Sequence, residues 1–151
     1  MKIAIDDLTG DGVVTLLEEH LADMYANSPP ESVHALDVSA LKHASITFWC
    51  ASEDGEALGC IALKDLGEKH GEIKSMRTTA RARNKGVGAA LLAHLLKEAK
   101  RRGFEQLSLE TGSMDFFKPA HRLYEKYGFT ECGPFSDYQL DPLSKFMTLN
   151  L

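Results

Sequence analysis

Two glycines, Gly86 and Gly88, stand one residue apart between a cationic stretch and an apolar helical pattern. Residues 70–78 before them have the character of a strand, and from Val87 onward apolar residues recur at helical spacing. A strand, a basic glycine loop and a helix in this order form an anion site, because the first turn of a helix leaves backbone N–H groups unpaired and its dipole favours negative charge. Glycines at this point let a phosphate approach the backbone closely. We therefore expect a phosphate-binding helix N-terminus at one edge of the fold.

The charge of the chain is strongly segregated around this loop. Residues 74–102 carry nine Lys or Arg and one Glu, whereas residues 1–73 carry four Lys or Arg and fourteen Asp or Glu. A nucleic-acid-binding protein would have a wider basic face, and the acidic flanks would repel a long polyanion. A small anion fits better, and no nucleic-acid partner is expected.

Two common phosphate motifs do not fit the loop. A P-loop needs Gly-Lys-Ser/Thr at its end, which the stretch GVGAAL lacks. The dinucleotide fingerprint needs a third Gly or Ala where this chain has Leu91, and it should follow the first strand of a βαβ unit. A purely packing role for the glycines, allowing the helix to lie tightly on the strand, remains an alternative, but it leaves the charge unexplained.

The order of predicted elements indicates an α+β sandwich around one mixed sheet, in a single domain covering residues 1–151. Asp54 and Gly55 are a strong hairpin signal between two β-rich runs, and Cys50 and Cys60 flank this turn nearly symmetrically. We expect these two cysteines to face each other as buried thiols. The predicted strands are 2–5, 46–51, 58–66, 70–78, 105–111, 129–135 and 145–151; the predicted helices begin at 11, 87 and 118, with a helical or looped connector at 31–45.

Other classes of protein are disfavoured by what the chain lacks. Three cysteines without a C-x-x-C pair indicate neither a disulfide framework nor a zinc site, and the histidine spacing suggests no metal. The N-terminus lacks the order of a signal peptide, and no apolar run is long enough to span a bilayer. We expect a cytoplasmic protein without a membrane or metal partner; a homodimer formed through the terminal strands is compatible with the sequence but not required by it.

Residues 83–88, RNKGVG, match the pattern Arg/Gln-x-x-Gly-x-Gly/Ala, which is the pyrophosphate-binding signature of the Gcn5-related N-acetyltransferase (GNAT) family. Residues 123–129, LYEKYGF, resemble the second motif of that family at the expected distance, and the order of elements agrees. The resemblance covers nearly the whole chain. It implies a three-layer sandwich with a mixed, mostly antiparallel sheet of about seven strands and helices on both faces.

The resemblance also implies acetyl-coenzyme A as the co-substrate, with its pyrophosphate on the amides around Lys85 to Ala89. The family strand before the loop splays from its neighbour, so the N–H of Met76 would bind the thioester carbonyl and Thr78 the pantetheine arm. Ordinary sheet pairing of Met76 is the alternative. The residues expected to bind the coenzyme are Met76, Thr78, Arg83, Lys85, Gly86, Val87, Gly88, Ala89, Phe117 and Tyr124.

In the expected reaction the acceptor amine attacks the acetyl group directly. Two side chains are candidates for acid–base catalysis of this step. Tyr124 is expected to protonate the departing thiolate, as the corresponding family tyrosine often does; the alternative is a packed aromatic ring. Glu72 is the expected general base, and strand periodicity puts it on one face with Lys74 and Met76. The ammonium of Lys74 would favour the ionised carboxylate and make it a weaker base, so a structural Glu72–Lys74 pair that only binds substrate is the alternative.

The sequence determines the residues of the acceptor pocket less well than those of the coenzyme site. Many family members carry Asn where this chain has Phe117, so an amide contact to the pantetheine is lost or made by another group. Glu110 and Thr111 leave a strand end and are expected to shape the acceptor pocket, and His34 lies in a connector that usually borders it. The expected substrate-binding residues are His34, Glu72, Lys74, Glu110 and Thr111. Of Phe48 and Trp49, one is expected to lie in the core and the other to line the cleft.

The resulting hypothesis is an enzyme that acetylates the primary amine of a small-molecule or amino-acid-like acceptor. Two alternatives stay open. The same machinery could acetylate a protein or peptide amine, which an open acceptor cleft would favour, or the chain could be a non-catalytic acyl-coenzyme A sensor.

Overall fold

The computed structural model describes residues 1–33 and 38–151, which form one seven-stranded sheet between two layers of helices. The strand order is β1-β2-β3-β4-β5-β7-β6, and β4 and β5 are the one parallel pair among the described strands. The strands are β1 (Lys2–Ile5), β2 (Ile46–Glu53), β3 (Glu56–Asp65), β4 (His70–Thr78), β5 (Gln106–Gly112), β6 (Thr130–Cys132) and β7 (Ser144–Asn150).

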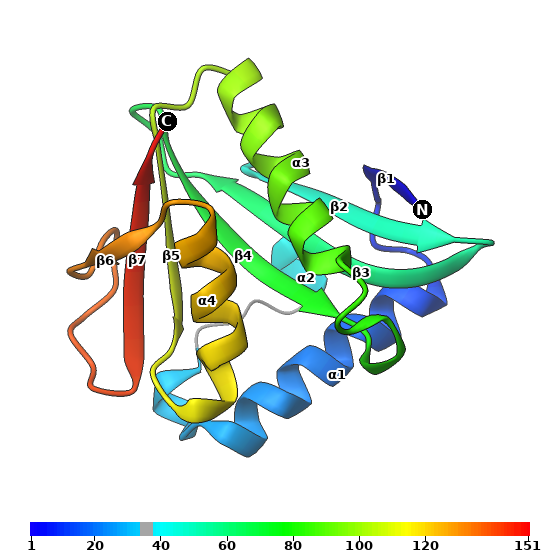
Figure 1. The fold of residues 1–151 in the computed structure, drawn as a ribbon, viewed down its shortest axis with the longest axis horizontal. Helices are drawn as coiled ribbons and strands as arrows, with labels where there is room; N and C mark the ends of the chain where they lie inside the picture. Colours follow the sequence, from blue (N-terminus) through cyan, green and yellow to red (C-terminus); the bar gives the residue numbers. More distant parts are fainter. Residues whose placement is uncertain (34–37) are drawn as a thin grey trace.

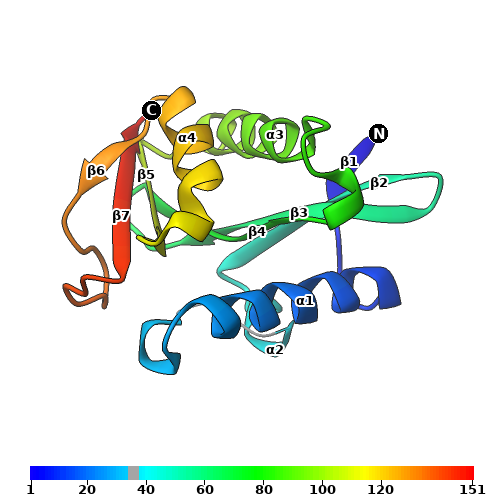
Figure 2. The ribbon, with the colours of Figure 1, turned by 60° about the horizontal axis from the view of Figure 1, so that its bottom comes forward.

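Helices α1 (Asp11–Asn27) and α2 (Val38–Leu41) cover one face of the sheet, and α3 (Val87–Arg101) and α4 (Lys118–Lys126) cover the other (Figures 1 and 2). Short 3₁₀ turns are η1 (Pro30–Ser32), η2 (Ala80–Ala82) and η3 (Asp115–Phe117). The predicted three-layer α+β sandwich with a mostly antiparallel mixed sheet is confirmed. Strand β6 is shorter than expected, since Gly133 and Pro134 follow it and proline cannot donate to a ladder.

Two apolar clusters lie on opposite faces of the sheet because successive residues of β2 and β3 alternate between them. Trp49 and Ile61 pack toward α3, whereas Phe48 and Cys60 pack toward Leu17 of α1. The expectation that Phe48 or Trp49 lines a cleft is wrong, since both are core residues. Cys50 and Cys60 are direct register partners and buried free thiols, as the hairpin predicted.

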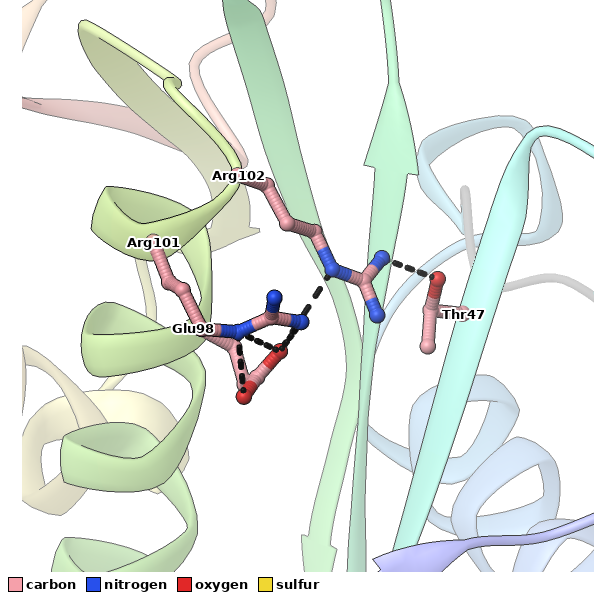
Figure 3. Close-up of polar contacts among 4 residues, drawn as sticks. All are labelled: Thr47, Glu98, Arg101 and Arg102. Atoms are coloured by element: carbon pink, nitrogen blue, oxygen red, sulfur yellow. Dashed lines mark hydrogen bonds and ion pairs between the residues drawn. The ribbon is translucent and has the colours of Figure 1, made fainter.

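The C-terminal end of α3 is tied to the sheet by charged side chains (Figure 3). Glu98 pairs with both Arg101 and Arg102, and the Arg102 guanidinium donates to the Thr47 hydroxyl at 2.8 Å. Arg102 also lies 5.5 Å from the centre of the Trp49 ring, a cation–π contact. These cations follow the preference for positive charge at a helix C-terminus. Of the two arginines, Arg102 is the one that joins the end of α3 to β2.

Strands β4 and β5 separate after a short paired stretch (Figure 1). Their register ends at Ile73 opposite Leu109, although β5 stays paired with β7 as far as Gly112. On its other side, β4 bulges against β3: Lys74 lies opposite Ala62 but Arg77 lies opposite Cys60. The result is an opening in the sheet beside Ser75 and Met76. These two residues have no register partner in the described strands.

The bulge reverses the side-chain alternation of β4 and corrects one sequence expectation. Ser75 has a positive φ of 53°, so the strand gains a residue there. Ile73 and Met76 both pack into the cluster beneath α3, while Glu72 and Lys74, which flank Ile73, project to the opposite face. Strand periodicity placed Met76 with Glu72 and Lys74, and this was wrong because the period of two does not survive a bulge.

Candidate functional site

A cleft of about 780 Å³ passes through the opening between β4 and β5 and reaches both faces of the sheet. On the α3 side it is lined by the first turn of α3 together with Leu123 and Tyr124 of α4. On the α1 side it is lined by Glu72, Lys74 and residues of α1 and η1. Two ligands entering from opposite faces could therefore meet at the opening.

The N-terminus of α3 fits a phosphate group on the evidence of its backbone. Gly86 caps the helix in the left-handed region at φ 81°, and a Cβ atom on it would meet nothing within 4 Å, so the space in front of its backbone is open. Gly88 lies against Met76, Thr78 and Leu123, which brings the helix start close to β4. The first backbone amides of α3 are thus exposed at the cleft with the dipole favouring an anion.

The cations of the loop are less concentrated at the cleft than their sequence spacing suggests. Arg81 pairs with Glu56 of β3, and Arg83 lies 3.8 Å from Asp23 of α1. Arg83 lines the cleft, whereas Lys85 is exposed and does not. The backbone of the helix start is therefore the main feature presented to an anion.

The structure brings together most of the residues selected from the sequence, in contact with one cleft. His34 lies outside the described residues. Those that line the cleft are Glu72, Lys74, Met76, Thr78, Arg83, Gly86, Val87, Gly88, Ala89, Glu110, Thr111, Phe117 and Tyr124.

Tyr124 is a buried phenol on the α3 side of the opening. Its side chain is 6% exposed, its ring packs edge-on against Phe129, and its hydroxyl donates to the sulfur of Met76 at 3.7 Å. Burial, assisted by the negative charge of Glu110, raises the pKa of the phenol above its ordinary value. The hydroxyl is consequently protonated at neutral pH and available to donate.

Glu72 is enclosed in a network on the α1 side. Its carboxylate is 2% exposed, and one oxygen, Oε2, accepts both from Lys74 Nζ at 3.0 Å and from the Tyr138 hydroxyl at 2.5 Å. Lys74 Nζ also donates to the Tyr138 oxygen at 3.0 Å. The ion pair with Lys74 that the sequence raised as an alternative is present, and Tyr138 completes it.

Glu110 is the second carboxylate on the α1 side. It lies one residue beyond the last β4–β5 pair, and its Oε2 accepts from the Ser144 hydroxyl at 2.9 Å. Burial raises the pKa of Glu110 from its ordinary value to about 7, against the opposing effects of Ser144 and Lys74. At neutral pH this carboxyl exchanges readily between its two protonation states.

Phe117, which replaces the usual family Asn, forms an apolar wall of the cleft. It is buried at the end of η3, and its ring fills the space that a Cβ on Gly112 would need. Phe116 stacks edge-on against it and is partly exposed at the cleft. This wall offers a pantetheine arm apolar contact rather than an amide hydrogen bond.

Sequence reasoning missed several cleft residues that come from distant segments. Tyr138 follows β6, His20 comes from α1 and Ser32 from η1. None of these has a local motif. The one available signal was an aromatic residue in the turn-rich stretch 133–143, which indicates a loop but not what the loop covers.

In residues 1–33 and 38–151, no three or more His, Cys, Asp or Glu side chains are grouped as metal ligands. None of the helices in these ranges is both long and apolar enough to cross a bilayer.

Comparison with known families and relatives was made over the full chain. The model of the acetyltransferase (GNAT) family matches residues 13–129. The chain is 56% identical to the uncharacterized N-acetyltransferase YsnE of Bacillus subtilis, over all of both chains. It is 47% identical to the uncharacterized N-acetyltransferase YedL of Escherichia coli, over 99% of this chain and 94% of that one, and 40% identical to the IAA acetyltransferase of Azospirillum brasilense, over 97% and 95%.

Solved structures with the same fold were also found. A putative acyl-CoA N-acyltransferase from Klebsiella pneumoniae superposes with a TM-score of 0.80 at 28% identity, covering 99% of this chain and 97% of that one. An aminoglycoside 6'-N-acetyltransferase complexed with coenzyme A superposes with a TM-score of 0.72 over 99% and 97%. At 16% identity the latter supports the fold alone.

Proposed function

The chain belongs to the acetyltransferase (GNAT) family, and from this premise we propose that it moves an acetyl group from acetyl-coenzyme A to a primary amine of a small-molecule or amino-acid-like acceptor. The observation that carries the proposal is the two-sided cleft at the separation of β4 and β5. One face offers a helix N-terminus for an anionic donor, and the other offers the buried carboxylate of Glu72 and the half-buried carboxylate of Glu110 for a cationic acceptor.

On the donor side, the first backbone amides of α3, which begins at Val87, and the side chain of Arg83 would hold the pyrophosphate. Thr78 and the apolar wall around Phe117 would flank the pantetheine arm. The coenzyme supplies an activated acyl group as a thioester. The open backbone at Gly86 supports this assignment.

At the opening, two groups of the chain would assist acyl transfer. The Met76 N–H, at the bulge, would stabilise the negative charge that develops on the thioester carbonyl oxygen, an effect worth roughly 3–4 kcal/mol per donor. The Tyr124 hydroxyl would donate its proton to the leaving sulfur. The proton of the amine would pass to a carboxylate on the α1 side, where Glu72 and Glu110 lie.

A small acceptor is favoured over a protein segment because the α1 side of the cleft is walled. Glu72 and Lys74 are almost fully buried there, beneath α1, η1 and the loop after β6. A peptide in extended form would need an open groove instead. The two carboxylates suit an acceptor that carries positive charge.

The decisive experiment follows thiol release from acetyl-coenzyme A across a panel of amines, together with calorimetric titration of the coenzyme. Arg83→Ala should weaken coenzyme binding by about 3- to 10-fold, less at high salt, because a partly exposed cation is screened. Arg101→Ala, at the far end of α3, is the matched control and should bind like the parent. Coenzyme binding without turnover of any amine would favour the sensor, turnover of peptides alone would favour the protein-acetylating alternative, and no binding would refute both the proposal and the sensor.

A further inference from the structure

We propose that Glu110, at the end of β5, is the group that takes the proton from the acceptor amine, and that Glu72 is a positioning residue. This inference rests on the acetyltransferase function proposed above and adds the identity of its base. It assigns catalysis to a residue that the sequence placed only among the walls of the acceptor pocket.

The position of Glu110 follows from the register of β5. Leu107 and Leu109 belong to the cluster beneath α3, so Ser108 and Glu110 project to the α1 face. Glu110 is the first residue of β5 beyond the last pair with β4. Its carboxylate therefore borders the opening on the acceptor side.

Glu72 is less suited to the proton transfer than Glu110 because two donors, one of them an ammonium, already occupy one of its carboxylate oxygens. Lys74 and Tyr138 both donate to Oε2, and Lys74 also donates to Tyr138, which closes the network. An amine proton would have to compete with these two donors for Oε2. Its role is to hold Lys74 and Tyr138 in place.

Within the described part of the chain, Glu110 forms no ion pair like the one between Glu72 and Lys74. Within residues 1–33 and 38–151, the Ser144 hydroxyl is the one hydrogen-bond partner of its carboxylate, and it occupies Oε2. The other oxygen, Oε1, remains for the amine. A carboxylate with one hydrogen bond and no ion pair accepts a proton more readily than one held by an ion pair.

The charged and titratable groups around Glu110 come from several elements. Lys74 and Glu72 face it from β4, and Asp141 from the loop before β7. Tyr124 of α4 and Tyr138 also sense its charge. The positive charge of Lys74 favours the ionised form, while burial and the other two carboxylates favour the protonated form, leaving a pKa of about 7, close to the optimum for a base at neutral pH.

The proposed step balances in atoms and charge. The acceptor ammonium first gives one proton to solvent. The lone pair of the neutral amine then forms the C–N bond to the acetyl carbon, and the C–S bond breaks with its electron pair going to sulfur. The nitrogen loses one proton to Glu110, and the sulfur gains one from the Tyr124 hydroxyl. Exchange with solvent then returns both side chains to their starting states.

The test is the pH dependence of kcat at saturating concentrations of both substrates, with an acceptor whose amine titrates above pH 9. The parent enzyme should show kcat rising through an apparent pKa near 7. Glu110→Gln should lower kcat by about 100-fold or more and abolish this limb, with coenzyme affinity unchanged. Glu105→Gln, an exposed glutamate just before β5, is the matched control and should keep the limb in place.

Two further variants keep the inference testable if Glu110→Gln fails to fold. Ser144→Ala removes a hydrogen bond that favours the ionised carboxylate, so the limb should move to higher pH. Glu72→Gln removes a negative charge near Glu110. The kcat of this variant should be lower than that of the parent, and its rise with pH should persist but move to lower pH.

Two patterns would overturn the assignment while leaving the acetyltransferase function standing. One is a Glu72→Gln enzyme that turns over but has lost the limb. The other is a limb that neither Glu110→Gln nor Ser144→Ala alters. If the parent released no thiol with any amine, the function itself would fail and the assignment with it.

Discussion

The chemical roles of individual side chains at the opening depend on their neighbours more than on their residue type. Tyr124 and Glu72 are both buried, yet one is surrounded by apolar groups and the sulfur of Met76, and the other by a cation and a phenol. The first environment preserves a neutral donor, and the second holds a charged pair. Residue type alone does not separate these roles.

Tyr124→Phe should lower kcat by about 10²-fold, because the ring packing against Phe129 is retained while the proton donor is lost. Coenzyme affinity and thermal stability should change little. Thiol-release kinetics and calorimetry measure the two effects separately. Tyr25→Phe, an exposed tyrosine of α1, is the control, and a Tyr124→Phe enzyme with the parent's kcat would end the acid assignment.

At the scale of elements, ion pairs join α1 to β4. Arg77 of β4 pairs with Asp23 and Glu19 of α1, and the buried His20 lies within reach of the same charges. Because Arg77 follows the bulge, it reaches α1 while Met76 reaches α3 and α4. This pairing holds α1 across the acceptor side of the cleft.

His20 should make the protein acid-labile. Burial, with the charge of Arg77, lowers its pKa from 6.5 to about 4, while Asp23 opposes this. Because the unfolded chain protonates first, the stabilisation is complete above pH 6.5 and is lost as the pH falls through 4, by up to about 3 kcal/mol.

Urea unfolding between pH 7 and 4 measures this loss. His20→Gln should flatten the pH dependence of the free energy of unfolding, whereas His43→Gln, at an exposed position, should not. An equal acid response in the parent and in His20→Gln would contradict the assignment.

At the scale of the whole molecule, the two apolar clusters are built on the same strands. Trp49 and Phe48 are neighbours in β2 that face opposite clusters, so loss of either cluster exposes one face of the same sheet. We propose that residues 1–151 form a single cooperative domain.

Leu17→Ala tests this proposal from the α1 side. Removing a fully buried leucine should destabilise the protein by about 2–5 kcal/mol. If the domain is cooperative, the fluorescence of Trp49, in the opposite cluster, should report the same shift as circular dichroism. Separate transitions for the two probes would indicate two independently folding halves.

Periodicity and turn chemistry determined the elements of this protein: the hairpin at Asp54-Gly55, the helix after Gly86 and the order that gives an α+β sandwich around one mixed sheet could all be derived locally. The three layers were implied by the resemblance to the family. The glycine loop likewise indicated the proposed donor side, since a helix N-terminus carries its own electrostatics. Only the tertiary structure decided the acceptor side. The bulge at Ser75 turned Met76 away from Glu72, and the loop after β6 brought Tyr138 onto Glu72. The pairing of β7 with β5 brought Ser144 onto Glu110. Register shifts and contacts between distant segments depend on how whole strands pack, and no short stretch of sequence encodes them.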